Sequence, residues 1–360
     1  RKRHGRSLQS GYPVSSFHRP IVHTPMSSNR QARICIYGAG AIGGHVGARL
    51  AHAGQVQLSV VARGAHLQAI RQHGLHLTSG ADQWQGAVAQ ATDDPSTLEE
   101  QDFVLVGLKA HSLPVHAAAI RRLLGRTGVA VFMTNGIPWW WNHGLSGEQA
   151  YLPLLDPDGT LWHEITPQRA IGCVIYSPNA IEAPGRIRHA PGRNLFVFGE
   201  PAGGGSERLS RLLDLLATSG LPVASTDDVR QEIWLKLLIN ASGNTLSALT
   251  RLGNAARAAS PELESLGAAL VHEVARIAAA AGWPLPDERV VAASTTLSGG
   301  VNQYPSMLQD VFAGRVIEVE PILGQPQAFA RHLNIPTPAI DVVVALLRGL
   351  NRHLEIGQTA

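Results

Sequence analysis

Residues 34–43 read Ile-Cys-Ile-Tyr-Gly-Ala-Gly-Ala-Ile-Gly, and this stretch predicts how the chain begins to fold. A strand-like apolar run leads into three glycines with the spacing G-x-G-x-x-G, and a helical pattern follows as far as Ala53. In a strand–turn–helix unit these glycines permit a tight turn, close approach of the backbone to a pyrophosphate, and close packing of the helix. The sequence therefore predicts a dinucleotide site formed by Gly38, Ala39, Gly40, Ala41, Ile42 and Gly43. A chance glycine turn is the alternative, and the flanking strand and helix argue against it.

Short apolar runs continue along the chain and alternate with amphipathic segments. The runs cover residues 56–62, 103–108, 129–134, 170–176, 195–198 and 222–225, and an amphipathic helix is predicted over 207–218. This rhythm is typical of βαβ units around a mostly parallel sheet. We therefore predict an α/β fold in which a Rossmann-type, doubly wound sheet forms an NADP-binding domain over residues 33–227.

The sequence pattern changes at residue 228, after which long Ala- and Leu-rich segments predict helices. Ser260-Pro261-Glu262 supplies an N-cap, a first-turn proline and a first-turn acid, and Gly282 with Pro284 ends the same helix. We expect an all-helical substrate and catalytic domain over residues 228–360. Residues 1–32 are rich in Arg, Ser, His and Pro without apolar periodicity, so we expect a disordered tail or an extension that precedes a natural start at Met26.

Composition argues against several classes of function. The formal charge is +3 and no basic block occurs beyond the first few residues, which gives no support to a nucleic-acid partner. No apolar stretch approaches the roughly 20 residues that a membrane helix needs. Cys35 and Cys173 each lie inside an apolar run, so we expect no disulfide, no thiolate metal site, and a reducing, cytoplasmic compartment. The histidines show no familiar metal spacing.

Lysine is rare in this chain. Of the 30 basic residues, three are lysines, namely Lys2, Lys109 and Lys236. An interior lysine is therefore notable, since an ammonium can lose its proton and a guanidinium effectively cannot. Lys236, Asn240 and Asn244 share one stripe of a predicted helix that is apolar in nearly every other direction. We expect this helix to be buried and its polar stripe to face a cleft, with an exposed polar strip as the alternative.

Three more side chains follow predicted strands. Arg63 stands twenty residues after Gly43, where an NAD-selective site usually carries an acid, and an arginine there suits the 2′-phosphate of NADP. A solvated arginine at a strand end is the alternative. Lys109 and Asn135 follow two other strand-like runs, whose carboxyl ends should open onto the nucleotide crevice, although ordinary loop polarity would also explain them.

This ordered series of residues resembles the ketopantoate reductases (2-dehydropantoate 2-reductases), and the resemblance covers nearly all of the chain from Arg33 onward. These enzymes depend on NADPH and consist of a Rossmann domain and a helical C-terminal domain, with the active site in the cleft between them. The matching residues are the glycine motif, Arg63, Leu108-Lys109-Ala110, Asn135-Gly136, Glu232 to Leu237, Asn240, Asn244, Asn254, Ser306 to Asp310, and Glu318.

The resemblance implies a role for each of these positions. Residues 38–43, Arg63, Lys109 and Asn135 would hold NADPH or NADP, with Glu318 beside its nicotinamide end. Lys236 would donate the proton, and Lys236, Asn240, Asn244, Asn254 and Ser306 would bind the 2-oxo acid. If Glu318 reaches the same cleft, we expect it to hold the ammonium of Lys236.

The reaction implied is reduction of 2-dehydropantoate to pantoate in pantothenate biosynthesis. A homodimer is one possible assembly, and the sequence does not specify the oligomeric state. Reduction of another 2-oxo acid is one alternative, because fold and cofactor site do not determine the acid. A protein that senses NADP(H) without turnover is another, and the intact Lys236 stripe argues against it.

Two features depart from the compact members of the family. Residues 136–168 form a longer segment with little periodicity that contains Trp139-Trp140-Trp141, and we expect a functional loop or a surface excursion. Pro178 stands where those members have a small residue lining the cofactor site.

Overall fold

The computed structural model describes residues 30–147, 150–295 and 303–359, so most of the predicted tail lies outside the described residues. An eight-stranded sheet has the order β12-β11-β8-β7-β6-β1-β2-β5, and all neighbouring strands are parallel except β8 and β11. Its strands are β1 (Arg33–Tyr37), β2 (Gln57–Val61), β5 (Gln90–Thr92), β6 (Phe103–Val106), β7 (Val129–Phe132), β8 (Ala170–Tyr176), β11 (Leu195–Gly199) and β12 (Val223–Ser225). The predicted α/β fold is confirmed.

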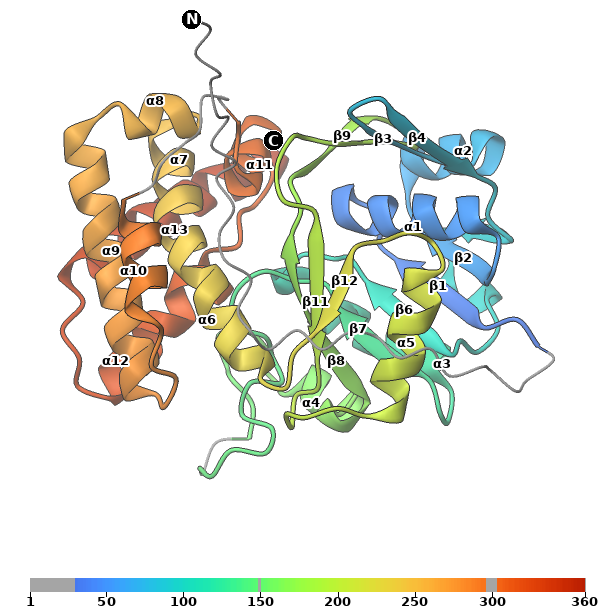
Figure 1. The fold of residues 1–360 in the computed structure, drawn as a ribbon, viewed down its shortest axis with the longest axis horizontal. Coiled ribbons are helices and arrows are strands. Elements are labelled where there is room, and N and C mark those ends of the chain that lie inside the picture. The colour runs from blue at the N-terminus through green and yellow to red at the C-terminus, as the bar shows by residue number, and fades with distance from the viewer. Residues whose placement is uncertain (1–29, 148–149, 296–302, 360) are drawn as a thin grey trace, which may run out of the picture.

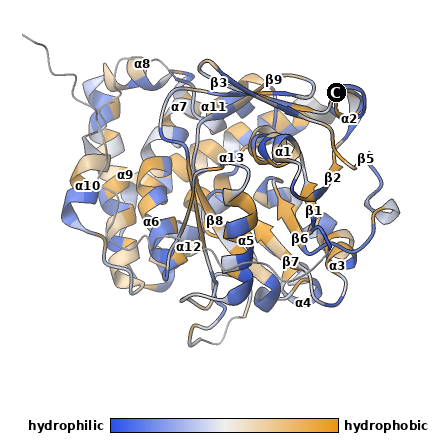
Figure 2. Cartoon of the chain, turned by 45° about the vertical axis from the view of Figure 1, so that its right-hand side comes forward, coloured by the Kyte–Doolittle hydropathy of each residue, from blue (hydrophilic) through white to orange (hydrophobic). Residues whose placement is uncertain are grey.

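Helices cover both faces of this sheet, as the doubly wound prediction requires (Figure 1). They are α1 (Ala41–Ala53), α2 (Gly64–His73), α3 (Ala117–Leu124), α4 (Thr160–Glu164) and α5 (Glu207–Ala217), with short 3₁₀ turns at η1 (Pro95–Thr97), η2 (Ala110–Ser112), η3 (Pro114–His116) and η4 (Pro167–Arg169). Two apolar clusters, one on each face of the sheet, form the core. The central strands β6 and β7 are hydrophobic throughout and appear as orange arrows in Figure 2.

A second sheet, which the sequence did not predict, lies over α1 (Figure 1). Its order is β4-β3-β10-β9, with β3 (Leu75–Ser79), β4 (Asp82–Gly86), β9 (Asn179–Ala183) and β10 (Arg186–His189). Two glycines of α1 make the close contact. A Cβ on Gly44 would lie 2.7 Å from the Ile187 side chain, and one on Gly47 would lie 2.7 Å from that of Leu75. Helix α1 is therefore enclosed by two sheets.

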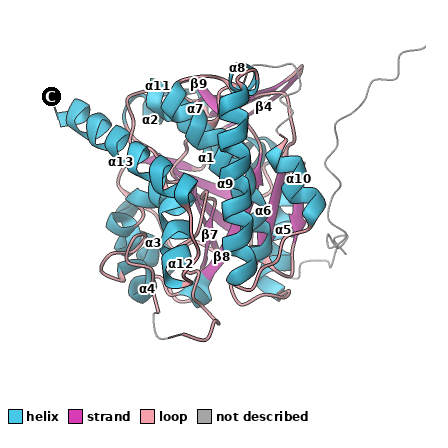
Figure 3. Ribbon diagram, turned by 90° about the vertical axis from the view of Figure 1, so that its left-hand side faces the viewer, coloured by secondary structure: helices cyan, strands magenta, loops and turns pink. Residues whose placement is uncertain are grey.

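The chain is helical beyond residue 228, as predicted (Figure 3). The elements are α6 (Val229–Ile239), α7 (Thr245–Thr250), α8 (Asn254–Ala258), α9 (Pro261–Ala280), α10 (Asp287–Ser294), α11 (Ser306–Phe312), α12 (Gln325–His332) and α13 (Pro338–Thr359), with π-helical turns at η5 (Asn240–Asn244) and η6 (Glu320–Gly324). Ser260 caps α9 by accepting a hydrogen bond from Leu263 N (3.4 Å). The predicted domain division at 227/228 falls in the turn between β12 and α6. Among the described helices, none combines the length and apolarity needed to cross a bilayer.

The tryptophan run in the segment 136–168 is buried, whereas residues 144–147 are exposed, so the expected surface excursion does not hold for the tryptophans. Trp139, Trp140 and Trp141 are each at most 2% exposed. The ring centroid of Trp141 lies 5.7 Å from that of Trp234 in α6 and 5.3 Å from that of Trp283. The tryptophans therefore pack between the sheet and the helices, and their apolar area explains why this part of the chain is held in place despite its lack of periodicity.

Candidate active site

The three glycines after β1 have distinct surroundings. Gly38 has φ +95°, a left-handed conformation that side chains disfavour. A Cβ on Gly43 would lie 2.1 Å from the carbonyl oxygen of Gly38, so α1 approaches the loop too closely for any side chain there. A Cβ on Gly40, in contrast, would meet no atom nearer than 4.0 Å. The loop is thus packed at two glycines and open at the middle one, in front of the N-terminus of α1, where backbone N–H groups favour an anion.

His66 holds the carbonyl side of this loop, and no sequence pattern pointed to it. Gly185 N–H donates to His66 Nδ1 (3.0 Å), so the ring proton is assigned to Nε2, which donates to Ala39 O (2.7 Å). Burial lowers the pKa of His66, which favours this neutral form. The imidazole therefore ties the glycine loop both to α2 and to the hairpin between β9 and β10.

The predicted cofactor residues gather at the carboxyl edge of the large sheet, where its parallel strands end. Gly38 follows β1, Lys109 follows β6 and Asn135 follows β7, and these strands are neighbours in the order β7-β6-β1. Arg63 follows β2 on the other side of β1, and its side chain is exposed without an ion pair to any described residue. A ligand lying across this edge would meet all four positions.

Lys109 bridges the two halves of the molecule. Its Nζ lies 2.7 Å from Asp310 Oδ2 and 3.3 Å from Glu318 Oε2, and Ala110 N–H donates to Glu318 Oε1 (3.0 Å). Burial lowers the pKa of Lys109. The negative charges of Glu318 and Asp310 raise it by more than burial lowers it, so the net pKa lies above its usual range. Glu318 is thus paired with Lys109 and not with Lys236, which corrects the expectation that it holds the Lys236 ammonium.

The loop after β7 also contacts the helical part of the chain. Ile137 N–H donates to Pro321 O (2.8 Å), and a Cβ on Gly136 would lie 2.3 Å from the same oxygen. Pro321 belongs to η6, which contacts η5. Asn135 is therefore held near the junction of η5 and η6 with the sheet edge.

Lys236, Asn240 and Asn244 lie along the continuous helical stretch from α6 into η5. Helix α6 is buried along most of its length, as predicted. Asn244 Nδ2 donates to Asn240 Oδ1 (3.1 Å), whereas the buried Nδ2 of Asn240 has no hydrogen-bond partner among the described residues. An unpaired buried amide is costly, so Asn240 has donor capacity to offer a ligand.

Lys236 reaches the sheet edge at the end of β8. Its Nζ lies 4.8 Å from the ring centroid of Tyr176, the last residue of that strand. Burial, and secondarily the positive charge of Arg193, lowers the pKa of Lys236 to about 8. An ammonium with this pKa can give up a proton near neutral pH, which is the property that general acid catalysis needs.

The structure ties Asn254 and Ser306 to the candidate site only through the helices that they begin. Asn254 begins α8 and its backbone N–H donates to Gln303 O (2.9 Å). Ser306 begins α11 with an exposed side chain, and α11 contacts both α7 and η5. Neither side chain is hydrogen-bonded to another candidate site residue in the described ranges, so their part in the site stays a prediction.

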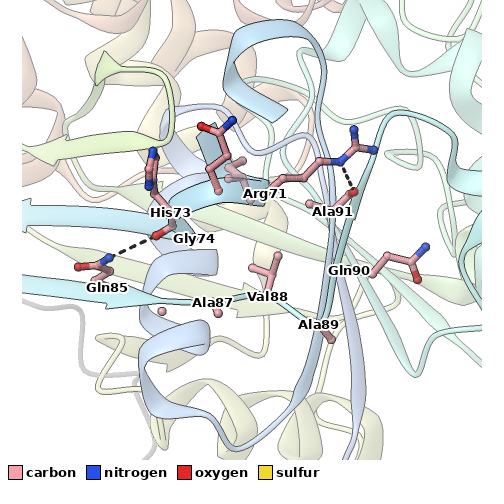
Figure 4. A pocket seen from close by; sticks show the side chains of 12 residues that line it. Arg71, His73, Gly74, Gln85, Ala87, Val88, Ala89, Gln90 and Ala91 are labelled. Atoms are coloured by element: carbon pink, nitrogen blue, oxygen red, sulfur yellow. Dashed lines mark hydrogen bonds between the residues drawn. The ribbon is translucent and has the colours of Figure 1, made fainter. Parts of the chain in front are cut away.

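Two cavities differ in their relation to these residues. The larger, about 700 Å³, is lined by residues 70–74 and 85–91 and contains none of the candidate site residues (Figure 4). Its polar groups pair with each other, since Arg71 Nε donates to Ala91 O (3.0 Å) and Gln85 Nε2 to His73 O (3.2 Å). The smaller, about 530 Å³, is lined by Ala110 and Glu318 among others and adjoins the Lys109 ion pairs. Of the candidate site residues, Glu318 alone lines this cavity, so we place the candidate site at the sheet edge beside η5 and not in either cavity.

Comparisons with known proteins match both parts of the chain to one family. Residues 34–203 match the family model "Ketopantoate reductase PanE/ApbA", and residues 228–351 match "Ketopantoate reductase PanE/ApbA C terminal". A 2-dehydropantoate 2-reductase of Mesorhizobium japonicum is 41% identical over 324 residues, which cover 88% of this chain and 97% of that protein.

Solved structures show the same fold. A PanE/ApbA family ketopantoate reductase from Ralstonia eutropha is 28% identical, with a TM-score of 0.76 over 89% of this chain and 99% of that one. D-mandelate dehydrogenase, in a ternary structure with NADH and anilino(oxo)acetate, is 21% identical, with a TM-score of 0.75 over 89% of this chain and 99% of that one.

Proposed function

Because the chain belongs to the ketopantoate reductase family, a family of oxidoreductases that act on CH–OH groups, we propose that it reduces 2-dehydropantoate to pantoate with NADPH, on the route to pantothenate. The observation that carries this proposal is Lys236, a lysine in a desolvated setting at the same sheet edge as the glycine loop. The fold alone does not specify a reaction. A proton donor beside the predicted dinucleotide site favours hydride transfer coupled to protonation of the product oxygen.

The residues present fit a nicotinamide dinucleotide. The open space at Gly40 and the N-terminus of α1 suit a pyrophosphate, and Arg63 is available for a 2′-phosphate. Lys109, Asn135 and Glu318 would hold the remainder of the cofactor along the ends of β6 and β7. When bound, NADPH supplies the hydride, and the protein contributes binding, orientation and the proton.

The substrate would lie between this edge and η5. Lys236 would donate its proton to the ketone oxygen as negative charge develops there. Asn240 Nδ2, which lacks a partner among the described residues, would donate to the same molecule, and Asn244 would orient Asn240 through their hydrogen bond. Asn254 and Ser306 would complete the substrate contacts from α8 and α11.

One assay tests the proposal directly. NADPH oxidation is followed at 340 nm across a panel of 2-oxo acids that includes 2-dehydropantoate. We expect the highest kcat/KM for 2-dehydropantoate. A higher kcat/KM for another 2-oxo acid would identify that acid as the substrate in place of 2-dehydropantoate. No turnover of any acid would contradict reductase function.

Cofactor selectivity should depend on Arg63. A guanidinium can pair bidentately with the 2′-phosphate that NADH lacks, so Arg63→Ala should weaken NADPH binding roughly 10- to 100-fold and NADH binding little. Fluorescence titration with both cofactors measures this. Arg71→Ala is the matched control, because Arg71 lies on α2, which directly follows Arg63, but donates to Ala91 O away from the site. Equal losses for NADPH and NADH would show that Arg63 does not select the phosphate.

Substrate affinity should depend on Asn244. Asn244→Ala removes both a predicted ligand and the group that orients Asn240, at about 1–3 kcal/mol. We expect a higher KM for the 2-oxo acid with NADPH affinity nearly unchanged, measured by steady-state kinetics and by cofactor titration of the same preparation. An unchanged KM for every active substrate would remove Asn244 from the site.

A further inference from the structure

Arg193 is a second cation beside Lys236 that the sequence patterns did not single out. The guanidinium carbon of Arg193 lies 4.3 Å from the ring centroid of Tyr176, and Lys236 Nζ lies 4.8 Å from the same centroid. The two charges are therefore no more than about 9 Å apart. One tyrosine ring is thus shared by two cations, one from each half of the chain.

The sheet topology explains how Arg193 reaches this place. Strand β11 is antiparallel to β8, and Leu195 pairs with Tyr176, so the start of β11 lies at the carboxyl edge of the parallel strands. The loop before β11 is tied to the turn after β8, because Ala190 N–H donates to Pro178 O (2.8 Å). Arg193 therefore enters the candidate site from the strand that runs in the opposite direction to its neighbour β8.

Neither cation has a carboxylate partner in the described part of the chain. No ion pair joins Lys236 or Arg193 to a described Asp or Glu. Glu232 and Arg289 also exert their charges on Tyr176. Residues 1–29, 296–302 and 360 contain no acidic residue, and residues 148–149 contain one, Glu148.

Two buried polar atoms on residues close to these cations have no hydrogen-bond partner among the described residues. The hydroxyl of Tyr176, a residue that is 6% exposed, has no hydrogen-bond partner among the described residues. Asn240 Nδ2, one helical turn beyond Lys236, also has no hydrogen-bond partner among the described residues. Two cations without a paired anion and two unsatisfied polar groups together describe a site for an anion that also carries hydrogen-bonding oxygens.

We propose that Arg193 binds the carboxylate of the 2-oxo acid, while Lys236 faces the adjacent ketone oxygen. This inference rests on the proposed function and assigns a residue and a chemical group within it. A guanidinium can hold a carboxylate through two parallel N–H···O bonds, which fixes the plane of the acid as well as its position. A 2-oxo acid has its carboxylate and ketone on adjacent carbons, so its two oxygen-bearing groups can meet two nearby cations at once.

The test compares Arg193→Gln and Arg193→Lys with the parent enzyme. Arg193→Gln should raise the KM for 2-dehydropantoate roughly 10- to 100-fold, because the charge-assisted bond is lost. Arg193→Lys, which keeps the charge without the bidentate geometry, should recover part of that loss. NADPH affinity, measured by fluorescence titration, should stay within about twofold in both variants, which also verifies that they fold.

A neutral substrate separates carboxylate binding from a structural role. The lactone of 2-dehydropantoate keeps the ketone and has no free carboxylate, so the parent and Arg193→Gln should reduce it with similar kcat/KM. Arg188→Gln is the matched control, since Arg188 lies on β10 of the second sheet with a half-exposed side chain paired to Glu182 (3.5 Å). This control should behave as the parent does with both substrates.

Binding of an unreactive anion makes the result independent of turnover. Oxamate carries a carboxylate beside a carbonyl, and its affinity for the parent and for Arg193→Gln is measured by calorimetry in the presence of NADP⁺. An unchanged affinity in the variant would overturn the assignment of Arg193, as would an equal loss of NADPH affinity. If the parent binds oxamate through Arg193 but reduces no 2-oxo acid, the proposed function fails and the anion site stands.

Discussion

Lys236→Ala should lower kcat for reduction of the 2-oxo acid by roughly 10²- to 10⁴-fold, the usual contribution of general acid catalysis. As hydride adds to the ketone, negative charge grows on its oxygen, and a positioned ammonium both stabilises that charge and supplies the proton. Lys236→Arg should not restore kcat, because an arginine can stabilise the charge but cannot release a proton. NADPH should still bind, since its predicted contacts lie at the ends of β1, β2, β6 and β7.

The pH dependence of the parent enzyme gives a second measure of the same group. Lys236 must be protonated to act as the acid, and its pKa is lowered to about 8 by burial and by Arg193. The rate of ketone reduction should therefore be highest below pH 8 and fall as the pH rises through that value. An unperturbed lysine would keep the rate high to about pH 10.

Stopped-flow and steady-state kinetics on the purified variants measure this effect, with circular dichroism as the check on folding. A folded Lys236→Ala enzyme with kcat within about threefold of the parent would remove Lys236 from proton transfer. A pH profile that is flat from 7 to 10 in the parent would contradict the role of its lowered pKa.

Alanine at Gly40 and at Gly43 should affect the protein in different ways. Gly40→Ala places a Cβ where no atom lies nearer than 4.0 Å, so the free energy of unfolding should change by less than about 0.5 kcal/mol. The added methyl occupies the space predicted for the pyrophosphate, and NADPH affinity should fall at least roughly tenfold. This variant separates cofactor binding from folding.

Gly43→Ala should damage both properties, because its Cβ would lie 2.1 Å from a backbone oxygen that cannot move independently of the loop. We expect the free energy of unfolding to fall by about 1–3 kcal/mol and NADPH binding to weaken at least as much as in Gly40→Ala. Urea denaturation and fluorescence titration measure the two effects. Parent-like NADPH affinity in Gly40→Ala would mean that no dinucleotide approaches this loop.

The sequence by itself determined the features that depend on neighbouring residues. The strands of the large sheet other than β5 follow from local apolar runs, and the glycine turn after β1 follows from glycine spacing, which the backbone of one strand–turn–helix unit requires. The N-cap of α9 at Ser260 follows in the same way from adjacent residues. Burial of α6 could also be inferred, because apolar residues occupy nearly all of its directions.

The tertiary structure alone decided which distant side chains meet. The second sheet joins β3 and β10, more than 100 residues apart, to cover the small face of α1, and no local pattern specifies such a pairing. Glu318, expected beside the nicotinamide end of the cofactor, pairs with Lys109 and not with Lys236, because the end of β6 lies against the chain before η6. Arg193 lies beside Lys236 only because β11 runs antiparallel to β8, and strand direction is set by packing of the whole sheet rather than by the residues of one strand.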